Sequence, residues 1–214
     1  MPSDQSNRPS SALRVLRTVL WVAVFVALAG YAVVISLEWF LLDDRLKSRQ
    51  SGQADIRSEF RLTDHAGRLV TQADYSGRWQ MVFFGFTNCP DICPTTLSYM
   101  ASVLDLLGDD ADRVAPLFIT VDPARDTAPV MGEYVAAFHP RLIGLTGTEA
   151  QVVEAARNFR TWFERTEDAS APDGYYMAHA GHIYLMRPDG SFEAVYLESD
   201  RPPEALAQEI SGKL

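Results

Sequence analysis

WQMVFFGF at residues 79–86 is a continuous apolar run bounded by turn residues, which is typical of a strand buried inside a sheet. The only two cysteines of the chain, Cys89 and Cys93, follow this run directly. Pro94 stands where a helix can begin. Proline has no backbone N–H, and the N–H groups in the first turn of a helix have no partner within the helix anyway. Apolar residues then continue from Leu97 with helical spacing. The sequence therefore predicts that both cysteines lie between a buried strand and a helix.

Strands and helices alternate through the rest of the C-terminal part of the chain. The expected strands lie at 60–71 (a hairpin), 114–121, 141–145, 182–186 and 192–197, and the expected helices begin near Pro129, Thr148 and Pro202. This alternation predicts an α/β fold in which helices cover both faces of a central, mostly parallel sheet, with the final hairpin as an antiparallel edge. In such sheets a site forms beyond the carboxyl ends of the strands, which is where the two cysteines fall.

The composition narrows the class of protein. The chain has 214 residues, of which 47% are hydrophobic and 22% are charged, so wholesale disorder is excluded. Its length allows one globular domain with an accessory segment. The net charge of -9 argues against a nucleic-acid partner, since such proteins carry basic patches that replace phosphate counterions.

Residues 18–37 read TVLWVAVFVALAGYAVVISL, a run without any charge that is long enough to cross a bilayer. A cleaved signal peptide is the alternative, but the run is longer than the usual signal core and no small-residue cleavage site follows it. We therefore expect an uncleaved transmembrane helix. A cytoplasmic tail (1–17) precedes it in this interpretation, and a polar linker (38–59) leads to a globular domain (60–214).

The orientation of this helix is inferred from the sizes of the segments on its two sides rather than from their charges. Basic residues flank both of its ends in nearly equal number, so the positive-inside rule gives little preference. The short N-terminal tail leaves the whole domain on the other side, where a reactive dithiol meets no competing cytosolic thiols. We expect a single-pass protein of the inner (cytoplasmic) membrane with its C-terminal domain on the periplasmic or exterior side.

The spacing of Cys89 and Cys93 favours chemistry over a structural disulfide. A bond between them would close too small a loop to constrain the unfolded chain much, so it would add little stability. Their spacing allows both sulfurs to converge at the start of a helix, where the positive end of the helix dipole lowers the pKa of a thiol. The pair therefore predicts a redox or metal site.

Three motifs resemble those of the Sco/SenC family of copper chaperones. They are FFGFTNCPDICPTTL at 83–97, VDPARDT at 121–127 and HIYLMRPDGSF at 182–192, within a similarity that spans about residues 60–214. The resemblance implies a thioredoxin-like fold that binds one copper ion per chain, as Cu(I) or Cu(II). It also implies a role in assembling the dinuclear copper centre of cytochrome c oxidase, whose copper-receiving subunit would be the partner.

Carried over residue by residue, the resemblance assigns the metal ligands to Cys89, Cys93 and His179. The histidine is found by its distance from the glycine of the Pro-Asp-Gly turn that follows. Asn88 and Ala178 depart from the family, which often has His before the first cysteine and Asp before the histidine. Neither is a ligand, so copper binding should survive. Soft thiolates favour Cu(I), imidazole accepts either copper state, and zinc would more usually have a fourth ligand.

Other polar residues are weaker candidates for the site. His182 would need a turn in the chain to join His179, because odd spacing in a strand puts side chains on opposite faces. His65 and His139 are expected at the surface, and Met177 is expected to pack rather than to offer its thioether.

Three carboxylates, Asp91, Asp122 and Asp126, are expected at the same edge of the sheet as the cysteines. They have two interpretations. They either cap and close turns, or they form an acidic rim that tunes the site or docks a partner.

Three other functions remain open. A membrane-tethered thiol–disulfide oxidoreductase would reduce the cysteines of an oxidase subunit, with a thioredoxin-like protein as its own reductant. Its motif would differ from the two-residue spacing of thioredoxin-type pairs.

A peroxidase of the peroxiredoxin type fits the sequence poorly, although Thr87 is close to Cys89. A redox or copper sensor cannot be distinguished by sequence.

Overall fold

The computed structural model of the chain describes residues 20–22, 28, 30–31, 56–171 and 173–214. The chain divides into two compact units, Met1–Gln53 and Ala54–Leu214. The predicted transmembrane helix at 18–37 lies for the most part outside the described residues, and so do the predicted tail and most of the linker. Among the residues that are described, no helix is both long and apolar enough to cross a membrane. The anchor and the division of the first 59 residues stay predictions.

A seven-stranded mixed sheet forms the centre of the second unit. Its strands are β1 (Arg61–Asp64), β2 (Leu69–Thr71), β3 (Trp79–Gly85), β4 (Val114–Thr120), β5 (Ile143–Thr146), β8 (Ile183–Met186) and β9 (Phe192–Tyr196). Their order across the sheet is β2-β1-β5-β4-β3-β8-β9. Every residue of β3 and β4 is buried, as the two apolar runs predicted.

Only part of this sheet is parallel. The central strands β3, β4 and β5 run parallel, whereas β1, β2, β8 and β9 pair antiparallel with their neighbours. The expectation of a mostly parallel sheet is therefore wrong. Tight turns join β1 to β2 and β8 to β9, and such turns can connect only antiparallel strands.

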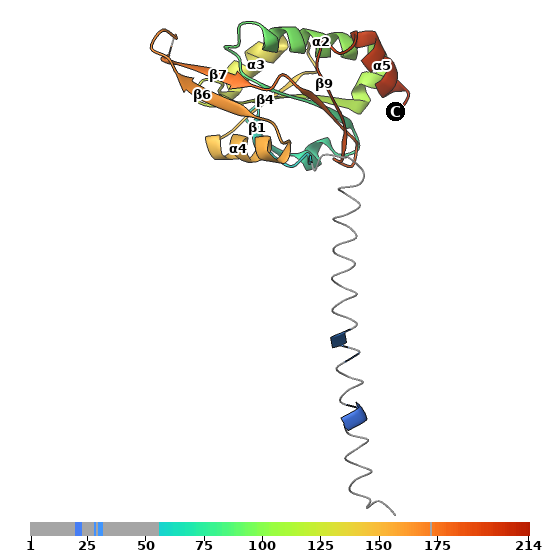
Figure 1. The fold of residues 1–214 in the computed structure, drawn as a ribbon. Coiled ribbons are helices and arrows are strands. Elements are labelled where there is room, and N and C mark those ends of the chain that lie inside the picture. The colour runs from blue at the N-terminus through green and yellow to red at the C-terminus, as the bar shows by residue number, and fades with distance from the viewer. Residues whose placement is uncertain (1–19, 23–27, 29, 32–55, 172) are drawn as a thin grey trace, which may run out of the picture. The chain divides into compact units, whose positions relative to one another are not determined.

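Helices cover both faces of the sheet. They are α2 (Ile92–Leu107), α3 (Ala128–Ala136), α4 (Glu149–Asn158) and α5 (Pro203–Ser211), with short 3₁₀ helices η1 (Gln72–Tyr75) and η2 (Gly108–Arg113). Figure 1 shows α2, α3 and α5 on one face and α4 on the other. Right-handed crossovers explain this arrangement. The chain forms β3, β4 and β5 in that order toward one edge of the sheet, and it then returns to form β8 on the other side of β3. The predicted start of a helix near Thr148 is confirmed, since Thr148 forms a capping box with Gln151 at the beginning of α4.

A second, two-stranded sheet was not predicted. It consists of β6 (Phe163–Glu167) and β7 (Tyr175–His179), paired antiparallel with Phe163 opposite His179. All of β6 except Phe163 is exposed, so this strand carries no apolar pattern that a sequence could reveal. We call β6, β7 and the loop between them the hairpin. Figure 1 shows it projecting beside α3.

Candidate metal centre

The two cysteines lie where β3 gives way to α2. Cys89 is half-buried in the loop after β3, and Cys93 is a fully buried residue in the first turn of α2. Both are free thiols. The backbone N–H of Cys93 donates to Cys89 Sγ across 3.5 Å, so the first sulfur lies against the positive end of the helix.

Gly85 makes room for the second sulfur. A Cβ atom at this position would lie 2.5 Å from Cys93 Sγ and 2.9 Å from the ring of Phe118. No side chain fits there without moving a buried neighbour. Sequence reasoning missed this residue, although a glycine within a run of large apolar residues is a signal of close approach.

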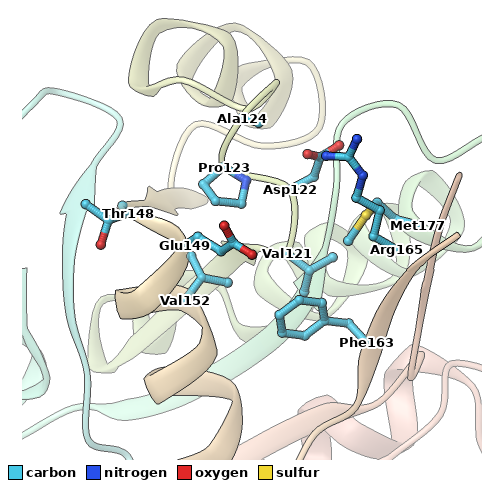
Figure 2. Close-up of a pocket in the computed structure, with 11 residues that line it drawn as sticks. Val121, Asp122, Pro123, Ala124, Thr148, Glu149, Val152, Phe163, Arg165 and Met177 are labelled. Carbon is cyan, nitrogen blue, oxygen red and sulfur yellow. The ribbon is translucent and has the colours of Figure 1, made fainter. Parts of the chain in front are cut away.

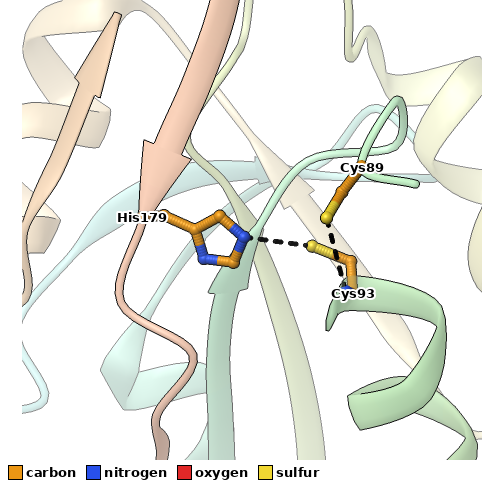
Figure 3. A group of neighbouring side chains, drawn as sticks. All are labelled: Cys89, Cys93 and His179. Carbon is orange, nitrogen blue, oxygen red and sulfur yellow. Dashed lines mark hydrogen bonds between the residues drawn. The ribbon is translucent and has the colours of Figure 1, made fainter. Parts of the chain in front are cut away.

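His179 reaches the cysteines from the end of β7. Its Nε2 lies 3.4 Å from Cys93 Sγ, and its Nδ1 lies 3.1 Å from the carbonyl oxygen of Ala180 (Figure 3). A carbonyl oxygen only accepts, so Nδ1 carries a proton and Nε2 is the ring nitrogen that faces the sulfurs. The rings of Phe83 and Phe86 meet the imidazole edge-on, with centroids 5.9 Å and 5.6 Å away. This apolar surround excludes water from one side of the imidazole.

The antiparallel direction of β8 explains why the histidine arrives here. Ile183, the first residue of β8, pairs with Phe83 near the carboxyl end of β3. The residues just before β8 therefore lie beside the loop that carries the cysteines. A parallel strand at this place would have put its beginning at the opposite edge of the sheet.

The three candidate ligand atoms lie within 4.8 Å of one another. Metal bonds of about 2.0–2.3 Å to nitrogen and sulfur would put three ligands around one ion about 3.5–4 Å apart, so small side-chain adjustments suffice. Over the described part of the chain, no other three side chains among His, Cys, Asp and Glu converge in this way. The donor set of two sulfurs and one imidazole fits a soft metal ion.

The two thiols differ in acidity. A hydrogen bond from the Cys93 thiol, aided by His179 and by backbone N–H groups, lowers the pKa of Cys89 to about 3 although burial opposes the shift. The same hydrogen bond, together with burial, raises the pKa of Cys93. Cys89 is therefore a half-exposed thiolate, and Cys93 is a buried thiol that stabilises it.

A pocket of about 700 Å³ opens onto one side of the site. Cys89 and His179 line it, with Ile92, Tyr176 and further residues of the hairpin, whereas Cys93 does not. A metal ion between the three ligands would therefore be approached from the side of Cys89 and His179. The two positions that depart from the family pattern are also on this wall: Asn88 and Ala178 line the pocket and are exposed.

The other histidines and Met177 lie apart from the group of three ligands or pack against the core. His65 Nδ1 accepts the backbone N–H of Gly144, and His139 Nδ1 accepts that of Arg141. His182 packs its ring near Tyr184, and Met177 packs against the hydrophobic core.

Asp122 and Asp126 follow the turn interpretation. Asp126 is fully buried and Asp122 is only 4% exposed, so the prediction of an acidic rim is wrong for both. Burial raises the pKa of Asp126, while three hydrogen bonds to the carboxyl group, two from Thr87 and one from Thr120, oppose the shift. Asp91 is exposed at the N-cap position of α2.

Comparison with known proteins agrees with this geometry. The family model SCO1/SenC matches residues 48–214. "Protein SCO2 homolog, mitochondrial" of Mus musculus is 41% identical over 169 residues, which are 78% of this chain and 64% of the mouse protein. The Homo sapiens protein of the same name is 36% identical over 209 residues, covering 96% of this chain and 77% of its own length.

A solved structure, Bradyrhizobium japonicum ScoI with copper bound, superposes with a TM-score of 0.69 at 38% identity. The match covers 74% of this chain and 99% of the ScoI chain. The mixed sheet, its helices and the relatives agree with the expected thioredoxin-like fold. The chain belongs to the SCO1/SenC family.

Proposed function

We propose that this chain binds one copper ion through Cys89, Cys93 and His179, and delivers it to the dinuclear copper centre of cytochrome c oxidase during assembly of the oxidase. The convergence of two sulfurs and one imidazole nitrogen within 4.8 Å carries the proposal. The copper bound to the similar Bradyrhizobium japonicum protein supports the choice of metal.

The chemistry of the ligand set suits transfer rather than storage. Two thiolates hold Cu(I) strongly, and the imidazole retains the ion when it is Cu(II). Three ligands leave the ion open to a further donor. Because Cys89 and His179 face the pocket, ligands of a receiving protein can replace them one at a time while Cys93 still holds the copper.

The same proposal includes the place of delivery. We propose a single-pass anchor at 18–37 in the inner (cytoplasmic) membrane, with the domain on the periplasmic or exterior side. The copper-receiving subunit of the oxidase would then meet the domain at the membrane surface. The uncharged run supports the anchor, and the short tail supports the orientation.

A thiol–disulfide oxidoreductase is the second candidate, and the asymmetry of the two thiols favours it. The Cys89 thiolate would attack a disulfide of an oxidase subunit and form a mixed disulfide with one of its sulfurs. Cys93 would then pass its proton to the client thiolate released in the first step, and its sulfur would attack Cys89 Sγ. This releases the second client sulfur as a thiolate, which takes a proton from water to complete the dithiol. The client gains two electrons, this chain becomes the Cys89–Cys93 disulfide, and a thioredoxin-like dithiol would restore it.

An anaerobic Cu(I) titration of the full chain in detergent separates these functions. We expect one copper per chain, and a loss of at least about tenfold in affinity for each alanine variant of Cys89, Cys93 and His179, since each removes a ligand. His182→Ala is the matched control and should bind normally. Delivery is contradicted as the main function if His179→Ala binds copper like the wild type and still reduces an oxidised fragment of the oxidase subunit.

A further inference from the structure

Two separate parts of the fold carry the candidate ligands. Cys89 and Cys93 belong to the central sheet and α2, whereas His179 ends a strand of the two-stranded sheet. The loop at residues 122–127, which follows β4, touches both parts. We call it the DPARDT loop after its sequence.

On the cysteine side, the contact is made by Asp126. Its carboxylate accepts the backbone N–H of Thr87 at 3.0 Å and the Thr87 hydroxyl at 2.6 Å. Thr87 lies two residues before Cys89, so these bonds fix the path of the chain into the cysteine motif. Asp126 is fully buried, and a charge-assisted pair of bonds in such a place holds its geometry firmly.

On the histidine side, the contact is made by Asp122 and Arg125. The Tyr175 hydroxyl donates to the two carboxylate oxygens of Asp122 at 3.0 Å and 3.2 Å. The guanidinium of Arg125 lies over the Tyr175 ring, 4.1 Å from its centroid, and Arg165 lies 3.8 Å from that centroid. Tyr175 and His179 belong to the same strand and point to the same side of it, so the tyrosine fixes the strand that ends at the histidine.

The loop between these contacts is itself closed by hydrogen bonds. The N–H of Asp126 donates to the carbonyl of Asp122 at 3.0 Å. The Thr120 hydroxyl donates to the Asp126 carboxylate and accepts the N–H of Asp122 at 2.9 Å. The Thr146 hydroxyl donates to the Asp126 carbonyl at 2.7 Å. Thr120 therefore contacts both the backbone of Asp122 and the carboxylate of Asp126, which couples the two ends of the loop.

We propose that the DPARDT loop is a clamp that sets the position of His179 relative to the two cysteines, with Thr87 and Tyr175 as the positioning residues on its two sides. The inference rests on the proposed copper site. Figure 2 shows part of the clamp at the rim of a neighbouring pocket of about 350 Å³, where Asp122 and Arg165 lie together beside Met177. Neither Thr87 nor Tyr175 belongs to the group of three candidate ligands, so each would act through the ligand that it positions.

Tyr175→Phe tests the histidine side in the full chain. The variant keeps the ring between the two guanidinium groups and removes only the hydroxyl. We expect Cu(I) affinity to fall about fivefold to tenfold, since a hydrogen bond to a carboxylate is lost, and the sulfur-to-Cu(II) charge-transfer band to shift. The potential of the Cys89–Cys93 disulfide should change less than the copper affinity does, because His179 supplies only one of several hydrogen bonds to the Cys89 thiolate.

Tyr196→Phe is the matched control, because it also removes a hydroxyl that donates to a carboxylate, that of Glu209 at 2.7 Å, from a ring that lies under an arginine, Arg201. Tyr196 is neither a candidate ligand nor part of the pocket beside the site. It should leave affinity, spectrum and potential as in the wild type. A merely structural role for Tyr175 would lower the unfolding temperature without moving the spectrum, and that result would overturn the inference.

Thr87→Val tests the cysteine side and the coupling. Because it loosens the chain before Cys89, it should change both the copper affinity and the disulfide potential. In the double variant with Tyr175→Phe, the loss of affinity should be smaller than the product of the single losses, since both act through one loop. Fully multiplicative losses would show two independent supports and no clamp.

The outcomes are distinguishable from those for the proposed function. If the wild type binds copper and His179→Ala weakens it, the copper site stands whatever the clamp variants do. If Tyr175→Phe then behaves like Tyr196→Phe, only the clamp is refuted.

Discussion

The cysteine half and the histidine half of the site are built in opposite ways. Cys93 is enclosed by β3, β4 and α2, and the backbone itself fixes its place. His179 ends a strand that belongs to a small separate sheet, one strand of which is almost wholly exposed. Core packing holds the first half, whereas side-chain bonds tether the second. The difference teaches that a sulfur pair fixed by core packing can be combined with a third ligand that side-chain contacts bring from another part of the fold.

Gly85→Ala breaks the cysteine half with the largest expected effect. The new methyl group would collide with Cys93 Sγ and Phe118, so we expect about 1–3 kcal/mol of lost stability and a roughly hundredfold loss of copper affinity. Urea unfolding measures the stability, and a Cu(I) competition assay measures the copper affinity. Gly181→Ala in the histidine half is the control, because its methyl group would meet Ile92 at an ordinary 3.6 Å. Equal effects at both glycines would contradict the contrast between the halves.

Hydrogen exchange compares the two halves directly. A two-stranded sheet with an exposed strand opens locally at little cost, so amides of β6 and β7 should exchange roughly a hundredfold faster than those of β3. Copper should slow exchange in the hairpin and leave β3 unchanged, because the metal ties His179 to the core. Mass spectrometry of both states measures this. Equal protection without copper would remove the proposed difference in mobility.

Alkylation of Cys89 sharpens the description of the cysteine half. Because the folded pKa is lowered to about 3, the thiolate persists as the pH falls and disappears only near that value. At pH 5 the gain in thiolate outweighs its lower nucleophilicity, and we expect a roughly tenfold faster reaction with iodoacetamide than for an ordinary thiol. Cys93→Ala removes the stabilising hydrogen bond and should restore ordinary pH dependence. A rate that falls steadily below pH 8 in the wild type would refute the assignment.

Met177→Leu has the smallest expected effect. Met177 precedes His179 by two positions on β7 and packs against the core, and leucine has a similar volume. We expect Cu(I) affinity to stay within about twofold of the wild type in a competition assay. A larger loss would mean that the thioether is a fourth ligand and that the histidine half supplies two donors.

The cysteine half could be predicted from the sequence because its parts are contiguous. The apolar run, the two cysteines and the helix after them follow one another within residues 79–107, so local rules suffice. Gly85 was nevertheless missed, since only the fold brings Cys93 against it.

The histidine half could not be predicted by local rules. The sequence FERTE of β6 looks like a solvated loop, and its pairing with β7 is stabilised by contacts far away in the chain. His179 was found only by its distance from a later turn in a family pattern. The bonds that hold the two halves join residues 39 and 53 positions apart, Thr87 to Asp126 and Asp122 to Tyr175, which no periodicity reveals.

The distance along the chain between the sulfurs and the imidazole has a consequence for biosynthesis. His179 follows Cys93 by 86 residues, so at a synthesis rate of about 5–20 residues per second the cysteines exist for about 4–17 s before the histidine is made. During that interval a nascent chain offers copper only two sulfurs and no imidazole. The complete ligand set exists only after β7 has been made and folded back, so full coordination marks a chain in which the hairpin has formed.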